Sequence, residues 1–272
     1  MNLKKLVIIF IIICFIIITS ISEMKFIPQS KEIKIISYNI HSGLNKDMFP
    51  TLFDIIDFLR VSDADIICLQ EVNESAKVGF QVSSLKEELK MYSHFGANVV
   101  NLGTNYGLVT YSKYPIKSEK HIYLSSDAEQ RGLLHTVVNV DGKKLNIINV
   151  HLGVKKEERE IQIKEVLDFA KSLDPEPYIV VGDFNEGEIS LEGTNLKDVA
   201  EETDKSNILT FASGLYRIDY ILASSNIEII DYNVLFKNMS DHYPIIARLK
   251  IWNKLQNKNN TYKIKTNNII II

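Results

Sequence analysis

The sequence has very little cysteine. Its 272 residues include two, Cys14 in an apolar stretch near the N-terminus and Cys68 in a predicted strand. Two cysteines so placed cannot form a disulfide framework or a cysteine-based metal site. The chain also lacks a Walker loop, a serine in a nucleophile elbow and a cysteine nucleophile. These absences exclude P-loop nucleotide hydrolysis and covalent catalysis by serine or cysteine.

The central part of the chain carries more negative than positive charge. The formal net charge is −3, but two lysines lie in residues 1–22 and four in residues 253–272, which leaves −9 for residues 23–252. Tight binding to long nucleic acid depends mainly on Lys and Arg contacts with phosphates. The central charge therefore counts against that class of partner.

Residues 1–22 are predicted to be separate from the fold. Lys4 and Lys5 precede an uncharged apolar run of 16 residues, from Leu6 to Ile21. As a helix this run would be about 24 Å long, short of the roughly 30 Å hydrocarbon core of a membrane. That length is typical of a signal peptide, while the lack of a clear Ala-x-Ala site leaves an uncleaved N-terminal membrane anchor equally open. Both readings predict an extracytoplasmic protein, anchored to the membrane or secreted.

The other end of the chain is also distinct. Residues 253–272 are rich in Asn and Lys and contain no acid, so we expect a basic flexible tail. The predicted folded domain therefore spans residues 23–252, and we expect it to be a monomer.

Short, β-branched apolar segments predict eight strands, and two segments with helical spacing predict helices. The strands are expected at 33–40, 64–72, 107–112, 133–140, 145–152, 178–184, 217–224 and 243–251, and the helices at 51–60 and 157–173. Asp141-Gly142 separates two of the strands and is typical of a hairpin turn. The order of strands and helices predicts an α/β architecture in which helices cover the strands.

Polar side chains stand where the predicted strands finish or begin. Asp183 and Asn185 follow the segment YIVVG, and on an extended backbone their side chains would face the same way. Six more positions share this placement: Asn39, Glu71, His151, Asp219, Asp241 and His242. A single strand-end Asn or Asp usually belongs to a turn, and a single His is usually structural. Eight acids, amides and imidazoles together are typical of a site at one edge of a sheet.

These residue types favour one kind of chemistry. Carboxylates with an amide and no thiol are hard oxygen ligands, suited to Mg²⁺ or Mn²⁺. Two histidines add proton transfer near neutral pH. The combination indicates metal-assisted attack of water on a phosphate ester.

Six short motifs carry a family resemblance. SYNIH, LQEV, NVHL, GDFN, RIDYIL and SDHYPI occur in this order between about Ile33 and Leu249. Together they resemble the endonuclease/exonuclease/phosphatase superfamily, which has the deoxyribonuclease I-like fold. The resemblance implies a hydrolase of phosphoric ester bonds. It also implies a four-layer α/β/β/α sandwich, with two mixed β-sheets face to face and helices outside.

The resemblance also implies a metal side of the site and a water-activating side. Glu71 would be the principal Mg²⁺ ligand, assisted by Asn39 and Asp241. Asp183 would orient or deprotonate the attacking water, and Asn185 would hold the phosphate.

Proton transfer and phosphate binding complete the implied site. Asp219 would pair with His242 and favour its charged form, and His151 would be the general acid to the leaving oxygen. Abasic-site endonucleases of the superfamily lack a histidine at the position of His151. Tyr106 and Arg131 are candidates for contact with the substrate phosphate, the alternatives being core packing and a surface ion pair. The remaining histidines are interpreted as structural: His41, His94, His121 and His135.

Fold alone does not determine the substrate. The acidic domain, the short stretch from Asp183 to Asp219 and the absence of a strongly apolar, aromatic hairpin favour a small, lipid-head-group or nucleotide phosphodiester. A secreted deoxyribonuclease I-like endonuclease is the alternative, since acidic surfaces can bind nucleic acid through divalent cations. A non-catalytic, membrane-tethered binding module is a third reading, disfavoured because all eight positions are present.

Overall fold

The structure, a computed structural model, describes residues 30–101, 103–214 and 216–251. The predicted leader (1–22) and tail (253–272) lie outside the described residues. Among the helices of the described part, none is long and apolar enough to cross a membrane.

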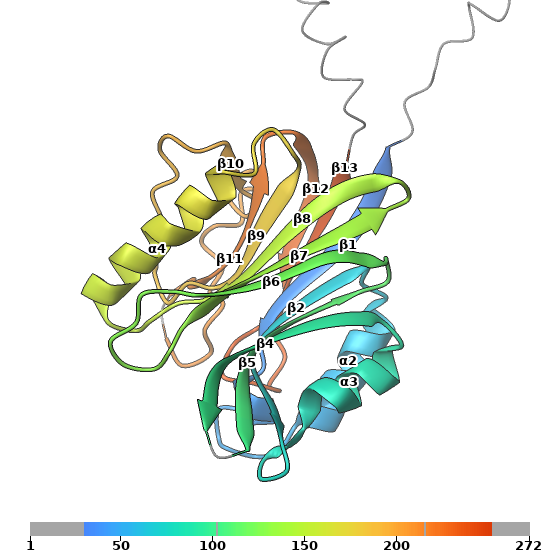
Figure 1. The fold of residues 1–272 in the computed structure, drawn as a ribbon, viewed down its shortest axis with the longest axis vertical. Coiled ribbons are helices and arrows are strands. Elements are labelled where there is room, and N and C mark those ends of the chain that lie inside the picture. Colours follow the sequence, from blue (N-terminus) through green and yellow to red (C-terminus); the bar gives the residue numbers. More distant parts are fainter. Residues whose placement is uncertain (1–29, 102, 215, 252–272) are drawn as a thin grey trace, which may run out of the picture. The chain divides into compact units, whose positions relative to one another are not determined.

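Two mixed β-sheets pack face to face (Figure 1). The first has the order β12-β13-β1-β2-β5-β4, and β3 pairs with β2. Its strands are β1 (Lys31–Asn39), β2 (Ile66–Ser75), β3 (Gly79–Phe80), β4 (Tyr92–Asn101), β5 (Thr104–Ser112), β12 (Ile227–Val234) and β13 (Ile245–Ile251). The second sheet has the order β10-β11-β9-β8-β7-β6. Its strands are β6 (Ile116–Tyr123), β7 (Gly132–Val140), β8 (Lys143–His151), β9 (Tyr178–Asp183), β10 (Leu196–Asp198) and β11 (Asp219–Ser224).

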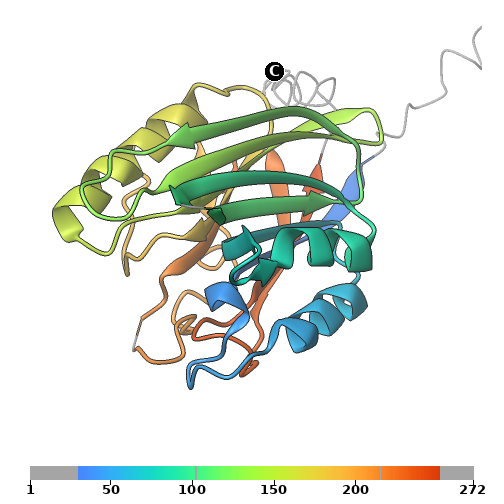
Figure 2. The same cartoon turned by 60° about the horizontal axis from the view of Figure 1, so that its bottom comes forward.

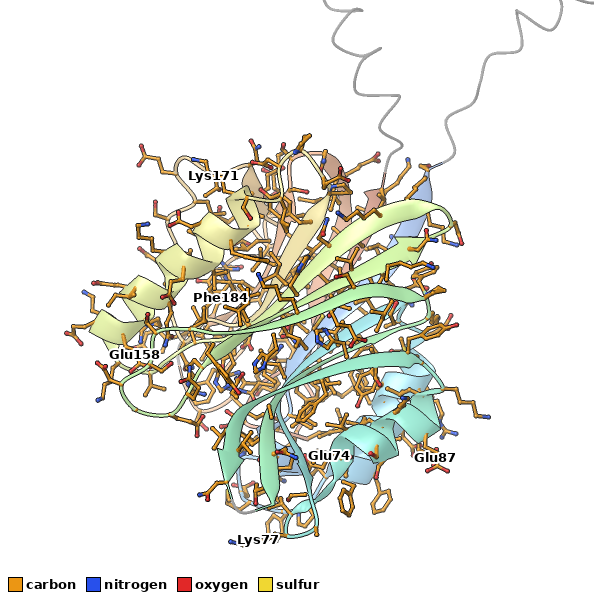
Figure 3. All side chains as sticks on the ribbon, in the orientation of Figure 1. Glu74, Lys77, Glu87, Glu158, Lys171 and Phe184 are labelled. Carbon is orange, nitrogen blue, oxygen red and sulfur yellow. The ribbon has the colours of Figure 1, made fainter. Side chains whose placement is uncertain are left out.

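Helices cover the outer face of each sheet (Figure 2). α2 (Leu52–Ser62) and α3 (Gln81–Leu89) pack on the first sheet, and α4 (Lys156–Lys171) packs on the second. Figure 3 shows Glu158 and Lys171 towards the two ends of α4 and Phe184 near the helix. Phe184 is fully buried in the cluster that also contains Val166 and Ala170 of α4. A short 3₁₀ turn, η1 (His41–Gly43), follows β1.

The pleat of the strands explains the layers. In β1, Ile33 and Ile35 point into the core between the sheets, whereas Ile36 and Tyr38 pack with the helices of the first sheet. The middle segments of the central strands are buried on both faces and are apolar, as in IICL of β2, YIVV of β9 and YILA of β11. The predicted four-layer α/β/β/α sandwich is confirmed.

The predicted elements match most of the observed ones. All eight predicted strands occur, as do both predicted helices, and Asp141 and Gly142 form the β7–β8 turn with φ values of 50° and 86°. The sequence patterns missed α3 and five strands: β3, β4, β6, β10 and β12.

Candidate active site

Strand pairing brings the polar strand ends to one edge of both sheets. In the second sheet, His151 at the end of β8 and Asp219 at the start of β11 both pair with Asp183 at the end of β9. In the first sheet, β1 ends at Asn39. Asn39 Nδ2 donates a buried hydrogen bond of 3.0 Å to Asp183 Oδ2. This bond joins the two sheets at the site.

The chain turns sharply where β9 ends. Gly182 has a φ of 142°, and a Cβ there would collide with the carbonyl oxygen of Val150 on β8, so the position requires glycine. Asn185 has a φ of 52°, and its backbone N–H donates to Asp183 Oδ1 at 2.9 Å. The prediction that strand alternation aligns Asp183 with Asn185 is therefore wrong. The strand stops at Asp183, and a turn closed by its carboxylate carries Asn185, whose Nδ2 donates to Leu152 O at 2.9 Å.

The Asp183 carboxylate lies at the centre of the site and is 1% exposed. Besides accepting from Asn39, its Oδ2 lies 3.5 Å from Nε2 of His151 and 3.5 Å from Nε2 of His242. Burial raises the pKa of Asp183 above its ordinary value. The charge of His242 lowers this pKa, and the charge of Asp219 raises it further. A carboxylate with a raised proton affinity is suited to take a proton from water.

His242 and Asp219 form a buried pair, in which Nδ1 of the imidazole lies 3.0 Å from Asp219 Oδ2. Burial by itself would lower the pKa of His242, but the carboxylates of Asp219 and Asp183 raise it well above its ordinary value. The imidazole is therefore charged at neutral pH, and both ring nitrogens are donors. Phe211 packs against this ring, with centroids 5.0 Å apart. Phe211 has no polar group, so the pattern of polar residues at strand ends did not indicate it.

Glu71 reaches the site through a β-bulge. The register of β2 against β5 shifts between Leu69 and Val72, and Glu71 has a φ of 58°, uncommon for a residue other than glycine. Glu71 Oε1 accepts from Asn39 Nδ2 at 3.0 Å. Burial, and then the charge of Glu71, raise the pKa of the hydroxyl of Tyr106 on β5.

Asp241 is linked to Asn39 through Ser240 and His41. Ser240 Oγ donates to the backbone oxygen of Asn39 at 2.8 Å and is 3.2 Å from Asp241 Oδ1. His41 Nδ1 lies 3.6 Å from the same Asp241 oxygen, and the His41 N–H donates to Asn39 Oδ1 at 3.0 Å. His41 was interpreted as structural, but the structure places it at the rim of the site. Its position two residues after Asn39 was the signal that could have identified it.

Arg131 and His151 are in direct contact. Arg131 Nη1 lies 3.0 Å from Nδ1 and 3.2 Å from Nε2 of His151, and it also pairs with Glu129 at 2.9 Å. Arg131 is 9% exposed, so it is a buried residue of the site as well as half of an ion pair. Burial, Arg131 and then His242 hold the pKa of His151 well below its ordinary value. Of the two buried imidazoles that face Asp183, His242 is therefore charged and His151 is neutral.

Two groups of residues could hold a cation. Asp183, Asp219 and His242 offer ligand atoms within 4.8 Å of one another. In this arrangement Nδ1 of the imidazole pairs with Asp219 and Nε2 faces Asp183, so a metal ion here would have to displace a proton that both carboxylates favour. The carboxylates of Glu71 and Asp241 are 21% and 24% exposed and are hard oxygen donors, which fits Mg²⁺ or Mn²⁺. Asn39 directs its amide nitrogen towards Glu71. In this arrangement Asn39 is a hydrogen-bond donor that positions the Glu71 carboxylate.

The other histidines have partners on neighbouring strands, at hydrogen-bond distances of 2.8 to 3.1 Å: His94 with Thr136, His121 with Asn98 and His135 with Asn146.

The fold and this constellation define a class of phosphoesterases, and comparison with known proteins agrees. The model of the Endonuclease/Exonuclease/phosphatase family matches residues 36–242, and the chain belongs to this family. Its members are hydrolases of phosphoester bonds that generally use a divalent metal, and their substrates include nucleic acid.

Sequence identity to individual known proteins is low to moderate. "Uncharacterized protein YbhP" of Escherichia coli is 33% identical over 176 residues, which cover 58% of this chain and 68% of YbhP. The structure of an endonuclease/exonuclease/phosphatase from Beutenbergia cavernae matches with a TM-score of 0.72 at 22% identity, covering 81% of this chain and 72% of that one. The mannosyl-6-phosphatase of Bacteroides thetaiotaomicron matches with a TM-score of 0.67 at 20% identity, covering 80% and 99%. At these identities the two structures show the shared fold.

Proposed function

We propose that the protein is an exported, Mg²⁺-dependent hydrolase that cleaves phosphodiesters by attack of water at phosphorus. The observation that carries the proposal is the position of the Asp183 carboxylate. It accepts a hydrogen bond from Asn39, which also holds Glu71, and it faces both His151 and His242. One buried carboxylate thus adjoins the metal-binding side and the imidazole side of the site.

In this proposal Asp183 orients the attacking water and accepts its proton. Charged His242 stabilises the negative charge that develops on the phosphoryl oxygens, and Asp219 keeps that imidazole charged and oriented. Asn185 has one amide hydrogen engaged with Leu152 O, and its second is available for the phosphate.

Glu71, Asn39 and Asp241 are proposed to hold Mg²⁺ or Mn²⁺. The bound ion would offset charge on a phosphoryl oxygen. Glu71 and Asp241 already present carboxylate oxygens, and Asn39 would assist by holding Glu71 in place through its Nδ2 hydrogen bond.

Arg131 and Tyr106 are proposed to contact the substrate phosphate. A phosphate that binds Arg131 competes with His151 for the guanidinium donors. Loss of that contact removes one cause of the lowered pKa of His151. Protonation of His151 then becomes easier, as its role of general acid to the leaving oxygen requires.

The proposed substrate is a small, lipid-head-group or nucleotide phosphodiester. The net charge of −9 over residues 23–252 supports this class over long nucleic acid. A secreted endonuclease is the second candidate, and the presence of His151 favours it over an abasic-site enzyme. Export, by a cleaved leader or a membrane anchor in residues 1–22, is part of the proposal and is supported by the apolar run from Leu6 to Ile21.

A substrate panel tests the proposal. We expect the purified protein to hydrolyse bis-p-nitrophenyl phosphate with Mg²⁺, to lose at least about 100-fold of that activity in excess chelator, and to regain it with Mg²⁺ or Mn²⁺. Sphingomyelin, phosphoinositides and plasmid DNA complete the panel. Nicking of plasmid far above the other activities would favour the endonuclease. Activity that is indifferent to chelation would contradict the metal-assisted mechanism.

His242→Ala is expected to lower kcat by about 10²- to 10³-fold, because it removes the positive charge that faces the phosphorus centre. The double variant His242→Ala/Asp219→Asn should lose little more than His242→Ala alone, since the two residues act as a unit. Circular dichroism of each variant checks that the fold is retained. A folded His242→Ala protein with the activity of the parent would remove the proposed dyad.

A further inference from the structure

The bulge that presents Glu71 is held by a side chain from the opposite sheet. Asn149 lies on β8 and is fully buried. Its Nδ2 donates to the backbone oxygen of Leu69 and to that of Val109, both at 3.1 Å. Leu69 and Val109 are the last regular pair of β2 and β5 before the register shifts. One amide group therefore ties together the two strands at the point where the bulge begins.

A second buried amide completes this bridge. Gln70 precedes Glu71, and its Nε2 donates to Asn149 Oδ1 at 2.8 Å and lies 3.2 Å from Ser37 Oγ of β1. Asn149 is thereby held on its oxygen as well as its nitrogen. Gln70 cannot move without disturbing Glu71, the next residue.

Asn149 interrupts an apolar face of β8. Leu145 and Ile147 belong to the apolar core between the sheets, and Asn149 and His151 continue the same face by alternation. A buried amide in an apolar layer costs free energy unless its hydrogen bonds are satisfied. All of its bonds here go to the β2–β5 bulge and to Gln70.

We infer that Asn149 is a positioning residue for Glu71, and that the Asn149–Gln70 bridge fixes the bulge from which Glu71 reaches the metal. The inference rests on the function proposed above for Glu71. Without the bridge, the left-handed backbone of Glu71 loses its support and relaxes towards a regular strand, which turns the carboxylate away from Asn39.

Asn146 provides a matched control. It lies on the same strand, is equally buried, donates to Pro177 O at 3.0 Å and bonds His135, but it touches neither the bulge nor the site. Asn149→Leu and Asn146→Leu therefore both remove a buried amide from β8. Of the two, Asn149→Leu also removes the support of the bulge that carries Glu71.

The test is Mn²⁺ binding by isothermal titration calorimetry without substrate, together with thermal unfolding and steady-state kinetics. Asn149→Leu should raise the Mn²⁺ dissociation constant at least about tenfold, and lower kcat with little change in KM. Asn146→Leu should lower Tm by a similar amount and leave Mn²⁺ affinity unchanged. Gln70→Leu leaves the hydrogen bonds of Asn149 to the two carbonyl oxygens, so it should show a smaller loss of Mn²⁺ affinity. It replaces Asn149→Leu in the test if that variant does not fold.

The outcomes separate the inference from the proposed function. Equal Mn²⁺ affinities of the parent, Asn149→Leu and Gln70→Leu would overturn the positioning role alone. An equal loss in Asn146→Leu would show a general effect of destabilisation and would also overturn it. Absence of Mn²⁺ binding in the unaltered protein would contradict the proposed function and remove the inference with it.

Discussion

Asp183→Asn is expected to lower kcat by about 10⁴-fold while leaving the protein folded. The carboxylate is the proposed base for water, and general base catalysis contributes about 10²- to 10⁴-fold. We place the loss at the upper end because Asp183 also adjoins both imidazoles and Asn39. Steady-state kinetics with bis-p-nitrophenyl phosphate measure the loss. A folded variant within tenfold of the parent would contradict the role of Asp183.

Stability provides an independent readout of the same substitution. The folded-state pKa of Asp183 is raised, so the parent loses stability as the pH rises from the ordinary carboxyl range through that pKa. The Asp183→Asn variant carries a neutral amide at this position and has no such loss. Without added metal, the difference in Tm between variant and parent should therefore move in favour of the variant between pH 5 and 8. A difference that is constant over this range would mean that the carboxylate is not strained by burial.

Glu71→Gln is expected to lower kcat by about 10³-fold at fixed Mg²⁺, since a metal supplies several kcal/mol of charge stabilisation. The Mg²⁺ concentration for half-maximal activity should rise as well, because an amide is a weaker ligand than a carboxylate. The matched control is Glu74→Gln, on the same strand, whose carboxylate accepts from the Ser83 N–H outside the site (Figure 3). Equal Mg²⁺ dependence of the parent and Glu71→Gln would contradict the assignment of Glu71 as the principal ligand.

The sequence predicted the centre of the fold better than its edges. The eight strands that it identified each contain a buried segment rich in apolar residues, and this composition is the signal by which a buried strand is recognised. The missed strands lie at or near sheet edges, where polar residues are favoured because they discourage pairing with other chains. β6, IKSEKHIY, is mostly exposed and carries charges at Lys117, Glu119 and Lys120, so its pattern is not that of a half-buried strand.

Residue type identified the polar side chains that gather at this edge. It did not predict the backbone conformations and the long-range contacts that bring them together. All eight strand-end residues belong to one edge, but alternation did not explain how Asn185 reaches it. Its left-handed backbone is a property of the turn. The contact of Arg131 with His151 and the bridge from Asn149 to Gln70 cross between residues far apart in the chain. A single sequence carries no signal for which distant side chains will meet.

Mn²⁺ soaked into crystals of the protein, located by its anomalous scattering, tests the central claim most directly. We expect the principal peak beside the Glu71 carboxylate, at the edge where β1, β8 and β9 end and β2 forms its bulge, and we expect it to disappear in Glu71→Gln. A peak between Asp183, Asp219 and His242, or none at this edge, would contradict the account.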